Sequence, residues 1–325
     1  MATIDVGPVS AGSGEKAFGY IEMFELPVSM MRLPVWIINS GTPGPRVVVT
    51  AGMHGTEYVG IEAATRLARQ TNPGDIRGAL VVFPVANVLG FEAADVLAVP
   101  IDGLNLNRVF PGDANGPPSF RLAHFLFESA RRIADAAIDL HGGDSAQALH
   151  PFAVTYETGE AAVDRRSMEM ARLFDMPFIW AMGPQTQTHP GMMISELNKC
   201  GIPAAIGEAG DLGTCREEDV RLHLRGISNI LKYLGSIEGT PERVLSSPPE
   251  VFRNDFRVAA SHGGVFDALV PIGARVRAGE LLGVIKSIKG DTLEEVTSPH
   301  PGVITSFQSA RVVHPGSRLY HGLMP

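Results

Sequence analysis

Two residues that bind metals in proteins, His54 and Glu57, stand three positions apart in the run Gly-Met-His-Gly-Thr-Glu that begins at Gly52. The run follows the β-branched segment 47–50, a predicted buried strand, and open α/β sheets bind ligands beyond the ends of their strands. An imidazole and a carboxylate at this spacing can converge on one cation. Zinc accepts such ligands, and a catalytic zinc site keeps one position open for water. The alternative is a loop histidine beside a glutamate that the helix dipole favours at a helix start.

A third ligand is expected from His141, which directly follows a predicted strand at residues 136–140. Two glycines come next and allow the backbone to turn sharply. Asp139 lies two residues before His141, and side chains two apart in a strand share one face, so Asp139 can orient the histidine from behind. Taken alone, His141 could equally cap a glycine turn. Together with His54 and Glu57 it would complete a hydrolytic zinc site with one ion per chain.

Two further segments carry polar groups suited to catalysis and binding. Glu208 lies in a glycine-flanked turn at another strand end, where a carboxylate can act as general base for a zinc-bound water. The alternative is an acidic residue of a surface loop.

Asn107 and Arg108 are adjacent in the turn-rich segment 102–112. The planar guanidinium of an arginine suits a substrate carboxylate; the alternative is an asparagine turn beside a surface arginine.

These candidates need a fold that brings several strand ends together. Short strands are predicted at residues 35–39, 47–50, 79–85, 136–140 and 202–207, and helices at 56–69, 119–132, 161–174, 191–199 and 215–233. Strands that alternate with helices predict an α/β fold with a mixed, mostly parallel sheet flanked by helices on both faces. Residues 1–30 look polar and irregular, with room for an entry strand.

The composition changes near residue 240. Residues 240–250 are rich in proline and serine and are typical of a linker. Beyond them, a short pattern that starts at Gly264 is repeated about 38 residues later from Gly302, which favours a small all-β module of two similar halves. We therefore expect a catalytic domain at residues 1–240 and a C-terminal β domain at 250–325 that covers the site or mediates assembly. The module resembles the barrel-sandwich fold of biotin and lipoyl carriers, but Lys286 and Lys289 lack the usual carrier setting.

Four motifs in one order resemble the succinylglutamate desuccinylase/aspartoacylase family, which is related to the zinc carboxypeptidases. They are GxHGxE at 52–57, DGxNLNRxFPG at 102–112, DLHGG at 139–143, and a strand ending in Gly-Glu at 207–208. The resemblance covers roughly residues 30–235, and a C-terminal β module is also a family feature. It implies zinc ligands at His54, Glu57 and His141, a general base at Glu208, and a substrate-binding pair at Asn107 and Arg108.

The chain departs from the family pattern at two places. Family members often have an arginine shortly before the Asn-Leu-Asn-Arg motif, whereas residues 78–107 contain no arginine or lysine and Val96 or a neighbour takes that place. Aspartoacylases also have an arginine about ten residues before the catalytic glutamate, where this chain has Asn198 and Lys199. The oxyanion donor is therefore unassigned. With Arg108 as the clear anchor, we expect a substrate with one essential carboxylate, such as an N-acetylated diamino acid; a hidden anchor would be Arg216 or Arg165.

The composition of the chain excludes two classes of binding partner, nucleic acids and membranes. A formal charge of −8 argues against nucleic-acid binding, and the apolar runs are too short to span a membrane. Two cysteines in no recognisable framework favour a cytoplasmic setting. The other histidines lack a strand-end setting and are expected to be structural or exposed; they are His124, His150, His189, His223, His262, His300, His314 and His321.

The function expected from these patterns is zinc-dependent hydrolysis of the amide bond of a small N-acyl amino acid. A homo-oligomer is compatible with the sequence. Two alternatives stay open: a zinc carboxypeptidase acting on short peptides, and a non-catalytic binding or carrier protein with a degenerate site.

Overall fold

A computed structural model describes residues 2–94, 97–186 and 189–325. The largest sheet in these ranges has nine strands. In spatial order they are β14 (Glu250–Phe252), β12 (Phe178–Met182), β11 (Phe152–Tyr156), β13 (Ala204–Glu208), β9 (Ala136–His141), β5 (Arg46–Ala51), β6 (Ala79–Phe83), β4 (Ser29–Asn39) and β3 (Glu15–Leu26). The pairs β14–β12, β12–β11, β13–β9, β9–β5 and β5–β6 are parallel, and the others are antiparallel. The expected mixed, mostly parallel sheet is confirmed.

Helices cover both faces of this sheet. They are α1 (Tyr58–Gln70), α2 (Val88–Glu92), α3 (Pro118–Ile133), α4 (Ala161–Leu173), α5 (Met193–Lys199) and α6 (Glu217–Leu234), with short 3-10 turns η1 (Pro73–Asp75) and η2 (Leu106–Arg108). Apolar side chains of α1, α4 and α6 join one buried core, and those of α3 and α5 join the core on the opposite face. Strands β6 and β9 are therefore buried along their whole length, which explains their nearly continuous apolar sequence.

The N-terminal region differs from the expectation of an irregular segment. It forms β1 (Ile4–Val6), β2 (Val9–Ala11) and the long β3, which pairs with β4 from Glu15 to Leu26. Because β3 is the edge strand of the large sheet, most of its side chains stay at least partly exposed. An edge strand of this kind needs no continuous apolar run, so its sequence looks polar.

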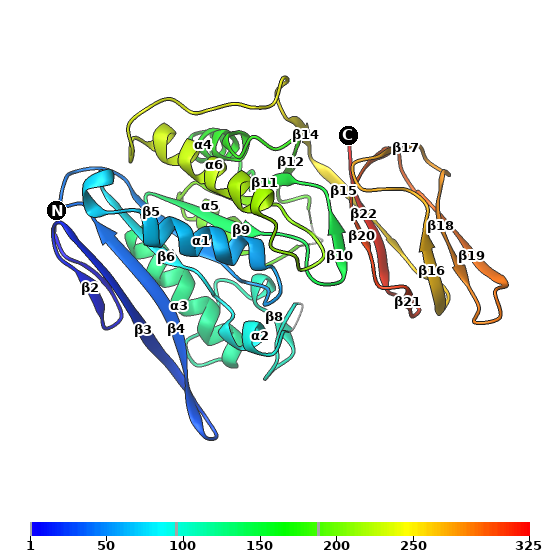
Figure 1. Ribbon diagram of the computed structural model, residues 1–325, viewed down its shortest axis with the longest axis horizontal. Coiled ribbons are helices and arrows are strands. Elements are labelled where there is room, and N and C mark those ends of the chain that lie inside the picture. Colours follow the sequence, from blue (N-terminus) through cyan, green and yellow to red (C-terminus); the bar gives the residue numbers. More distant parts are fainter. Residues whose placement is uncertain (1, 95–96, 187–188) are drawn as a thin grey trace.

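The C-terminal residues form two antiparallel sheets at one end of the molecule, far from the N-terminal hairpin β3–β4 (Figure 1). The first contains β10 (Gln147–Leu149), β20 (Gly302–Gln308), β22 (Arg318–Met324) and β15 (Asn254–Ala259), with β17 (Arg275–Val276) paired to β20; the second contains β19 (Thr292–Thr297), β18 (Leu281–Lys286), β16 (Gly264–Ala268) and β21 (Val312–Val313). Tyr320 is buried between them, and its hydroxyl donates a hydrogen bond to the carbonyl of Leu282 at 2.7 Å. The two copies of the sequence repeat begin at β16 and β20, one in each sheet.

Two strand pairings cross the expected domain boundary. Strand β10 comes from residues 147–149 but pairs with β20 of the C-terminal sheet, and β14 at residues 250–252 pairs with β12 of the large sheet. The division into residues 1–240 and 250–325 stays a prediction, and these pairings connect the two parts through backbone hydrogen bonds.

The topology sets the position of the site. Strands β5, β9 and β13 are parallel neighbours, so their carboxyl ends meet at one edge of the sheet. The short strands β7 (Ala98–Val99) and β8 (Leu104–Asn105) lie in the segment that leads into η2.

Cys200 and Cys215 are free and exposed. Among the described residues, no helix has the length and apolarity needed to cross a membrane.

Candidate metal centre and active site

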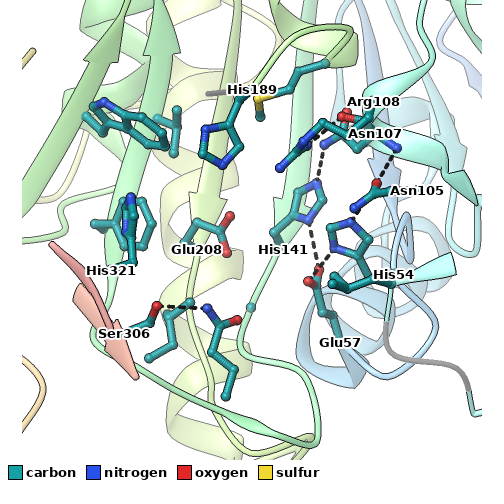
Figure 2. Close-up of a pocket in the computed structure, with 18 of the residues that line it drawn as sticks. His54, Glu57, Asn105, Asn107, Arg108, His141, His189, Glu208, Ser306 and His321 are labelled. Atoms are coloured by element: carbon teal, nitrogen blue, oxygen red, sulfur yellow. Dashed lines mark hydrogen bonds and ion pairs between the residues drawn. The ribbon is translucent and has the colours of Figure 1, made fainter. Parts of the chain in front are cut away.

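Three predicted ligands meet at the carboxyl edge of the large sheet. His54 follows β5, Glu57 directly precedes α1, and His141 ends β9. The Nδ1 atom of His54 lies 2.6 Å from Oε1 of Glu57, and Nδ1 of His141 lies 2.8 Å from Oε2. Figure 2 shows the two imidazole rings turned toward this carboxylate. One potential ligand atom from each residue lies within 4.8 Å of the others, so the sequence-predicted set is brought together.

Glycines let the chain segments approach closely enough to form this cluster. A Cβ on Gly55 would overlap the backbone of Gly90, and a Cβ on Gly142 would overlap the carbonyl oxygen of Ala209. Gly142 and Gly143 do not adopt a positive φ. The glycines after His141 therefore permit close packing between neighbouring strand ends, and neither of them uses the left-handed conformation that glycine adopts more easily than other residues.

The outer nitrogen of each histidine is held by another side chain. Nε2 of His54 lies 3.2 Å from Oδ1 of Asn105, and Nε2 of His141 lies 2.9 Å from Oδ2 of Asp139. Asp139 is fixed in turn by the hydroxyl of Thr50, which donates a hydrogen bond at 2.7 Å. With each Nε2 hydrogen directed to an oxygen acceptor, each Nδ1 is left to bind a cation. The geometry agrees with the orienting position expected for Asp139, and Asn105 is a partner that the sequence reasoning missed.

The chemistry of this cluster fits a zinc ion. All three ligands are buried, with Glu57 only 5% exposed. Oε2 of Glu57 is buried and lacks a hydrogen-bond partner of good geometry among the described residues, although Nδ1 of His141 is close. Burial acts to raise the pKa of Glu57, but the charges of His54 and His141 outweigh it and lower the pKa to about 2. Zinc accepts a donor set of this kind, in which a buried carboxylate lies beside two imidazoles whose Nε2 atoms are held by other side chains.

Replacing Asp139 with asparagine is expected to weaken zinc binding by about 10- to 100-fold. The substitution keeps the shape of the side chain but removes the charge that orients and polarises His141. Competition with a chromophoric chelator would measure the zinc dissociation constant. Asp135→Asn is the matched control, because Asp135 lies just before the same strand and pairs with Arg46 at 3.0 Å, away from the cluster. Equal zinc affinities for Asp139→Asn and the unmodified chain would show that Asp139 has no orienting role.

Glu208, at the end of β13, faces the metal-binding cluster across a cavity of about 110 Å³ (Figure 2). Its carboxyl group keeps some exposure through the cavity but is surrounded by protein atoms. Burial, with the negative charges of Glu57 and Asp139, raises the pKa of Glu208 to about 8, against the opposing effects of His141 and Arg108. A carboxyl group in this pKa range can accept and release a proton near neutral pH.

Asn107 and Arg108 line the same cavity from the turn η2. The side chain of Asn107 is buried; Oδ1 accepts the Met193 N–H at 2.9 Å, which directs Nδ2 toward Nε2 of His141 at 3.2 Å. The guanidinium of Arg108 donates to the carbonyl of Asn107 at 2.6 Å. Burial and two nearby arginines lower the pKa of Arg108 to about 10, so it remains cationic at neutral pH. The structure thus places a fixed amide and a cation beside the predicted metal site.

The C-terminal sheet contributes residues that the sequence reasoning missed. Ser306 of β20, with Arg318 and His321 of β22, lines the cavity, and so does His189. His189 and His321, which the sequence predicts to be structural or exposed, therefore lie beside the site, and a structural role for them stays a prediction. Glu208, the nearest of the predicted site residues, precedes Ser306 by 98 positions in the sequence. No local motif marks this approach, because packing of the C-terminal sheet creates it.

The other candidate substrate anchors lie elsewhere in the described structure. Asn198 is buried and donates to the carbonyl of Tyr156 at 2.7 Å, and Lys199 pairs with Glu196 at 2.7 Å. Arg216 pairs with Asp211 and Asp219, and Arg165 is exposed on α4. None of these four is among the described residues that line the cavity. Val96 lies outside the described residues.

Comparisons with known proteins agree with the geometry. The model of the succinylglutamate desuccinylase/aspartoacylase catalytic domain matches residues 43–234. The chain is 28% identical over 287 residues to N-alpha-acetyl-L-2,4-diaminobutyric acid deacetylase from Halomonas elongata, a match covering 85% of this chain and 82% of that protein.

Solved structures extend the likeness to the whole fold. A succinylglutamate desuccinylase/aspartoacylase from Rhodobacter sphaeroides superposes with a TM-score of 0.84 and 27% identity, over 95% of each chain. The product-bound ectoine utilization protein EutE (DoeB) from Ruegeria pomeroyi superposes with a TM-score of 0.87 and 23% identity, over 98% of this chain and 99% of that one. The second likeness concerns the fold alone.

Proposed function

Because the chain belongs to the succinylglutamate desuccinylase/aspartoacylase family, we propose that it is a zinc-dependent deacylase that hydrolyses the amide bond of a small N-acyl amino acid. The observation that carries this proposal is the convergence of three groups on one cavity. They are the buried ligand set of His54, Glu57 and His141, the carboxyl group of Glu208 facing it, and the guanidinium of Arg108.

Each group has a distinct role in the proposed reaction. A zinc ion held by His54, Glu57 and His141 would supply an activated water and a Lewis acid for the amide carbonyl. Glu208 accepts a proton from the attacking water and passes a proton to the leaving nitrogen as the C–N bond breaks. The products are a carboxylate from the acyl group and the free amino acid. Arg108 holds the α-carboxylate of the substrate, with Asn107 beside it.

The substrate panel follows from the cavity and from the relatives. The Halomonas protein is a deacetylase of N-α-acetyl-2,4-diaminobutyrate by name, so this compound belongs in the panel with N-acetyl and N-succinyl derivatives of neutral and acidic amino acids. The zinc-loaded protein is incubated with each compound and with short peptides, and release of free amine is measured. We expect hydrolysis of N-acyl amino acids, and loss of that activity after treatment with a chelator.

The C-terminal strands favour a small substrate over a peptide. Ser306, Arg318 and His321 form one wall of the cavity, which encloses only about 110 Å³. An extended peptide would need an open groove on that side. If short peptides were hydrolysed faster than every N-acyl amino acid of the panel, the chain would be a carboxypeptidase. If it bound these compounds without hydrolysis, it would be a binding protein.

Arg108→Ala is expected to lower kcat/KM for N-acyl amino acids about ten- to hundredfold. The reason is the loss of a charge-assisted hydrogen bond to the carboxylate, worth about 1.5–3 kcal/mol. The effect should be mainly on KM, and Arg108→Lys should recover part of it, since lysine keeps the charge but lacks the planar fork. Steady-state kinetics with an N-acyl amino acid and its carboxamide provide the measurement. If the arginine binds the carboxylate, the carboxamide is a poor substrate for both proteins.

A further inference from the structure

His223 is a histidine of α6 that has no role in the proposed reaction. Its side chain is fully buried, and its Nε2 atom lies 3.0 Å from the backbone carbonyl oxygen of His141. A carbonyl oxygen can only accept, so Nε2 carries the hydrogen and donates it. The sequence predicts a structural or exposed residue at this position. The structure shows a buried one that is bonded to the residue at the end of β9.

The carbonyl of His141 lies where the ends of two strands meet. It also accepts the backbone N–H of Ala209 at 3.2 Å. Glu208, the residue before Ala209, is opposite His141 in the parallel pairing of β13 with β9. Figure 2 shows the side chains of His141 and Glu208 on these neighbouring strands. One oxygen atom therefore receives hydrogen bonds from α6 and from the residue next to the proposed general base.

The backbone on both sides of His141 is closely packed. A Cβ on Gly142 would overlap the carbonyl oxygen of Ala209, and a Cβ on Gly60 of α1 would overlap the carbonyl oxygen of Leu140. Protein interiors of this density transmit a displacement instead of absorbing it. A shift of the His141 carbonyl is therefore expected to move its imidazole relative to the end of β13.

Fold stability alone does not favour a histidine at this position. The Nδ1 atom of His223 is buried and has no hydrogen-bond partner among the described residues, which is unfavourable for a polar atom. A leucine would fill the same part of the core without that cost, and the His141 carbonyl would keep the Ala209 N–H. Residues that break the packing rules in this way are expected at functional sites.

We propose that His223 is a positioning residue, whose hydrogen bond to the His141 carbonyl sets the distance between the zinc-binding imidazole of His141 and the carboxyl group of Glu208. The inference rests on the proposed deacylase function and adds to that site a residue that lies outside the cavity, since His223 is not among the described residues that line it. Without the bond, the end of β9 is free to shift. A small misplacement of reacting groups lowers turnover strongly.

Two substitutions of His223 and one matched control test this role. His223→Leu removes the donor and keeps an apolar side chain in the core, whereas His223→Gln keeps an N–H that can reach the same carbonyl. The control is Ser167→Ala. Ser167 is fully buried on α4, and its Oγ accepts the backbone N–H of Ala204 at 3.3 Å. Ala204 begins the strand that Glu208 ends, so the control removes a helix-to-strand bond far from the site.

The metal reports the position of His141 without turnover. The visible absorption spectrum of the cobalt-substituted protein depends on ligand geometry, and we expect it to change in His223→Leu. The zinc dissociation constant should rise about tenfold, the lower end of the usual effect of losing an outer partner of a ligand. His223→Gln and Ser167→Ala should keep the spectrum and the zinc affinity. The melting temperature of His223→Leu should stay close to that of the unmodified protein, because the unpaired Nδ1 is removed.

Kinetics separate positioning from substrate binding. At saturating zinc, kcat of His223→Leu for the best N-acyl amino acid should fall by about ten- to hundredfold. KM should change little, because Arg108 holds the α-carboxylate from η2, which the substitution does not touch. His223→Gln should recover most of the lost kcat, and Ser167→Ala should keep the kcat of the unmodified protein.

The outcomes distinguish the positioning role from the deacylase function. If His223→Leu keeps its cobalt spectrum, zinc affinity and kcat, the positioning role is wrong and the deacylase function stands. The positioning role is also wrong if kcat falls only in proportion to melting temperature, and falls equally in Ser167→Ala, because the bond would then be merely structural. If the unmodified protein hydrolyses no compound of the panel, the proposed function fails for this class. The cobalt spectra and zinc affinities of the three variants then still decide the role of His223.

Discussion

Glu208→Gln is expected to keep its zinc and lose turnover by about 10²- to 10⁴-fold, the usual cost of removing a general base. Glutamine has nearly the same shape, and the Glu208 side chain makes no hydrogen bond shorter than 3.5 Å to the described residues that would need to be replaced. Glutamine cannot, however, take a proton from the attacking water. Zinc content by atomic absorption and kcat with an N-acyl amino acid are the two measurements.

The control for this variant is Glu157→Gln. Glu157 follows β11, the strand beside β13, but pairs with Arg253 at 2.9 Å on the surface. Glu157→Gln should retain both zinc and turnover. KM should change little in Glu208→Gln, since Arg108 rather than Glu208 holds the α-carboxylate. If Glu208→Gln kept near-normal kcat, proton transfer would have to be assigned to another group of the cavity.

The parts of the site that the sequence predicts are those carried by local patterns at strand ends. His54 and Glu57 occupy one turn between β5 and α1, so their spacing alone brings their side chains together. His141 and Asp139 share one strand, and the period of two places both on one face. The parallel arrangement of β5, β9 and β13, inferred from alternating strands and helices, then brings the three strand ends to one edge of the sheet.

The parts that the sequence does not predict depend on contacts between distant segments. Arg318 and His321 reach the cavity only because β10 pairs with β20 and carries the C-terminal sheet against the strand ends. No period or motif within β22 indicates that contact. Asn105 is an intermediate case: it belongs to the same motif as Asn107 and Arg108, but its role in holding His54 becomes visible only when η2 is placed beside the metal-binding cluster. The length and pairing of β3, in a region that the sequence leaves as irregular with room for an entry strand, are hidden for a simpler reason, since an edge strand buries few side chains.

His141→Ala is expected to bind zinc more than about 100-fold less tightly, because loss of a direct ligand should exceed the 10- to 100-fold cost typical of an outer partner. Activity toward N-acyl amino acids should disappear at limiting zinc. The fold should survive, because β9 lies at the centre of the sheet and its apolar residues Ile138 and Leu140 remain buried. Zinc retained after dialysis is the direct measurement, and thermal melting by circular dichroism checks the fold.

Two further variants make the ligand assignment decisive. His262→Ala is the matched control, since His262 is more than half exposed and lies 3.4 Å from Glu294 in the C-terminal region; it should bind zinc as the unmodified chain does. The alanine variant could melt early because it leaves the buried carboxylate of Asp139 without its partner. In that case His141→Asn is the variant to use, since it keeps a polar group beside Asp139. A zinc ion bound at full occupancy in both His141 variants would place the metal elsewhere. Loss of zinc in both, with an intact melting transition, assigns His141 as a ligand and makes the turnover of Glu208→Gln interpretable as a catalytic effect.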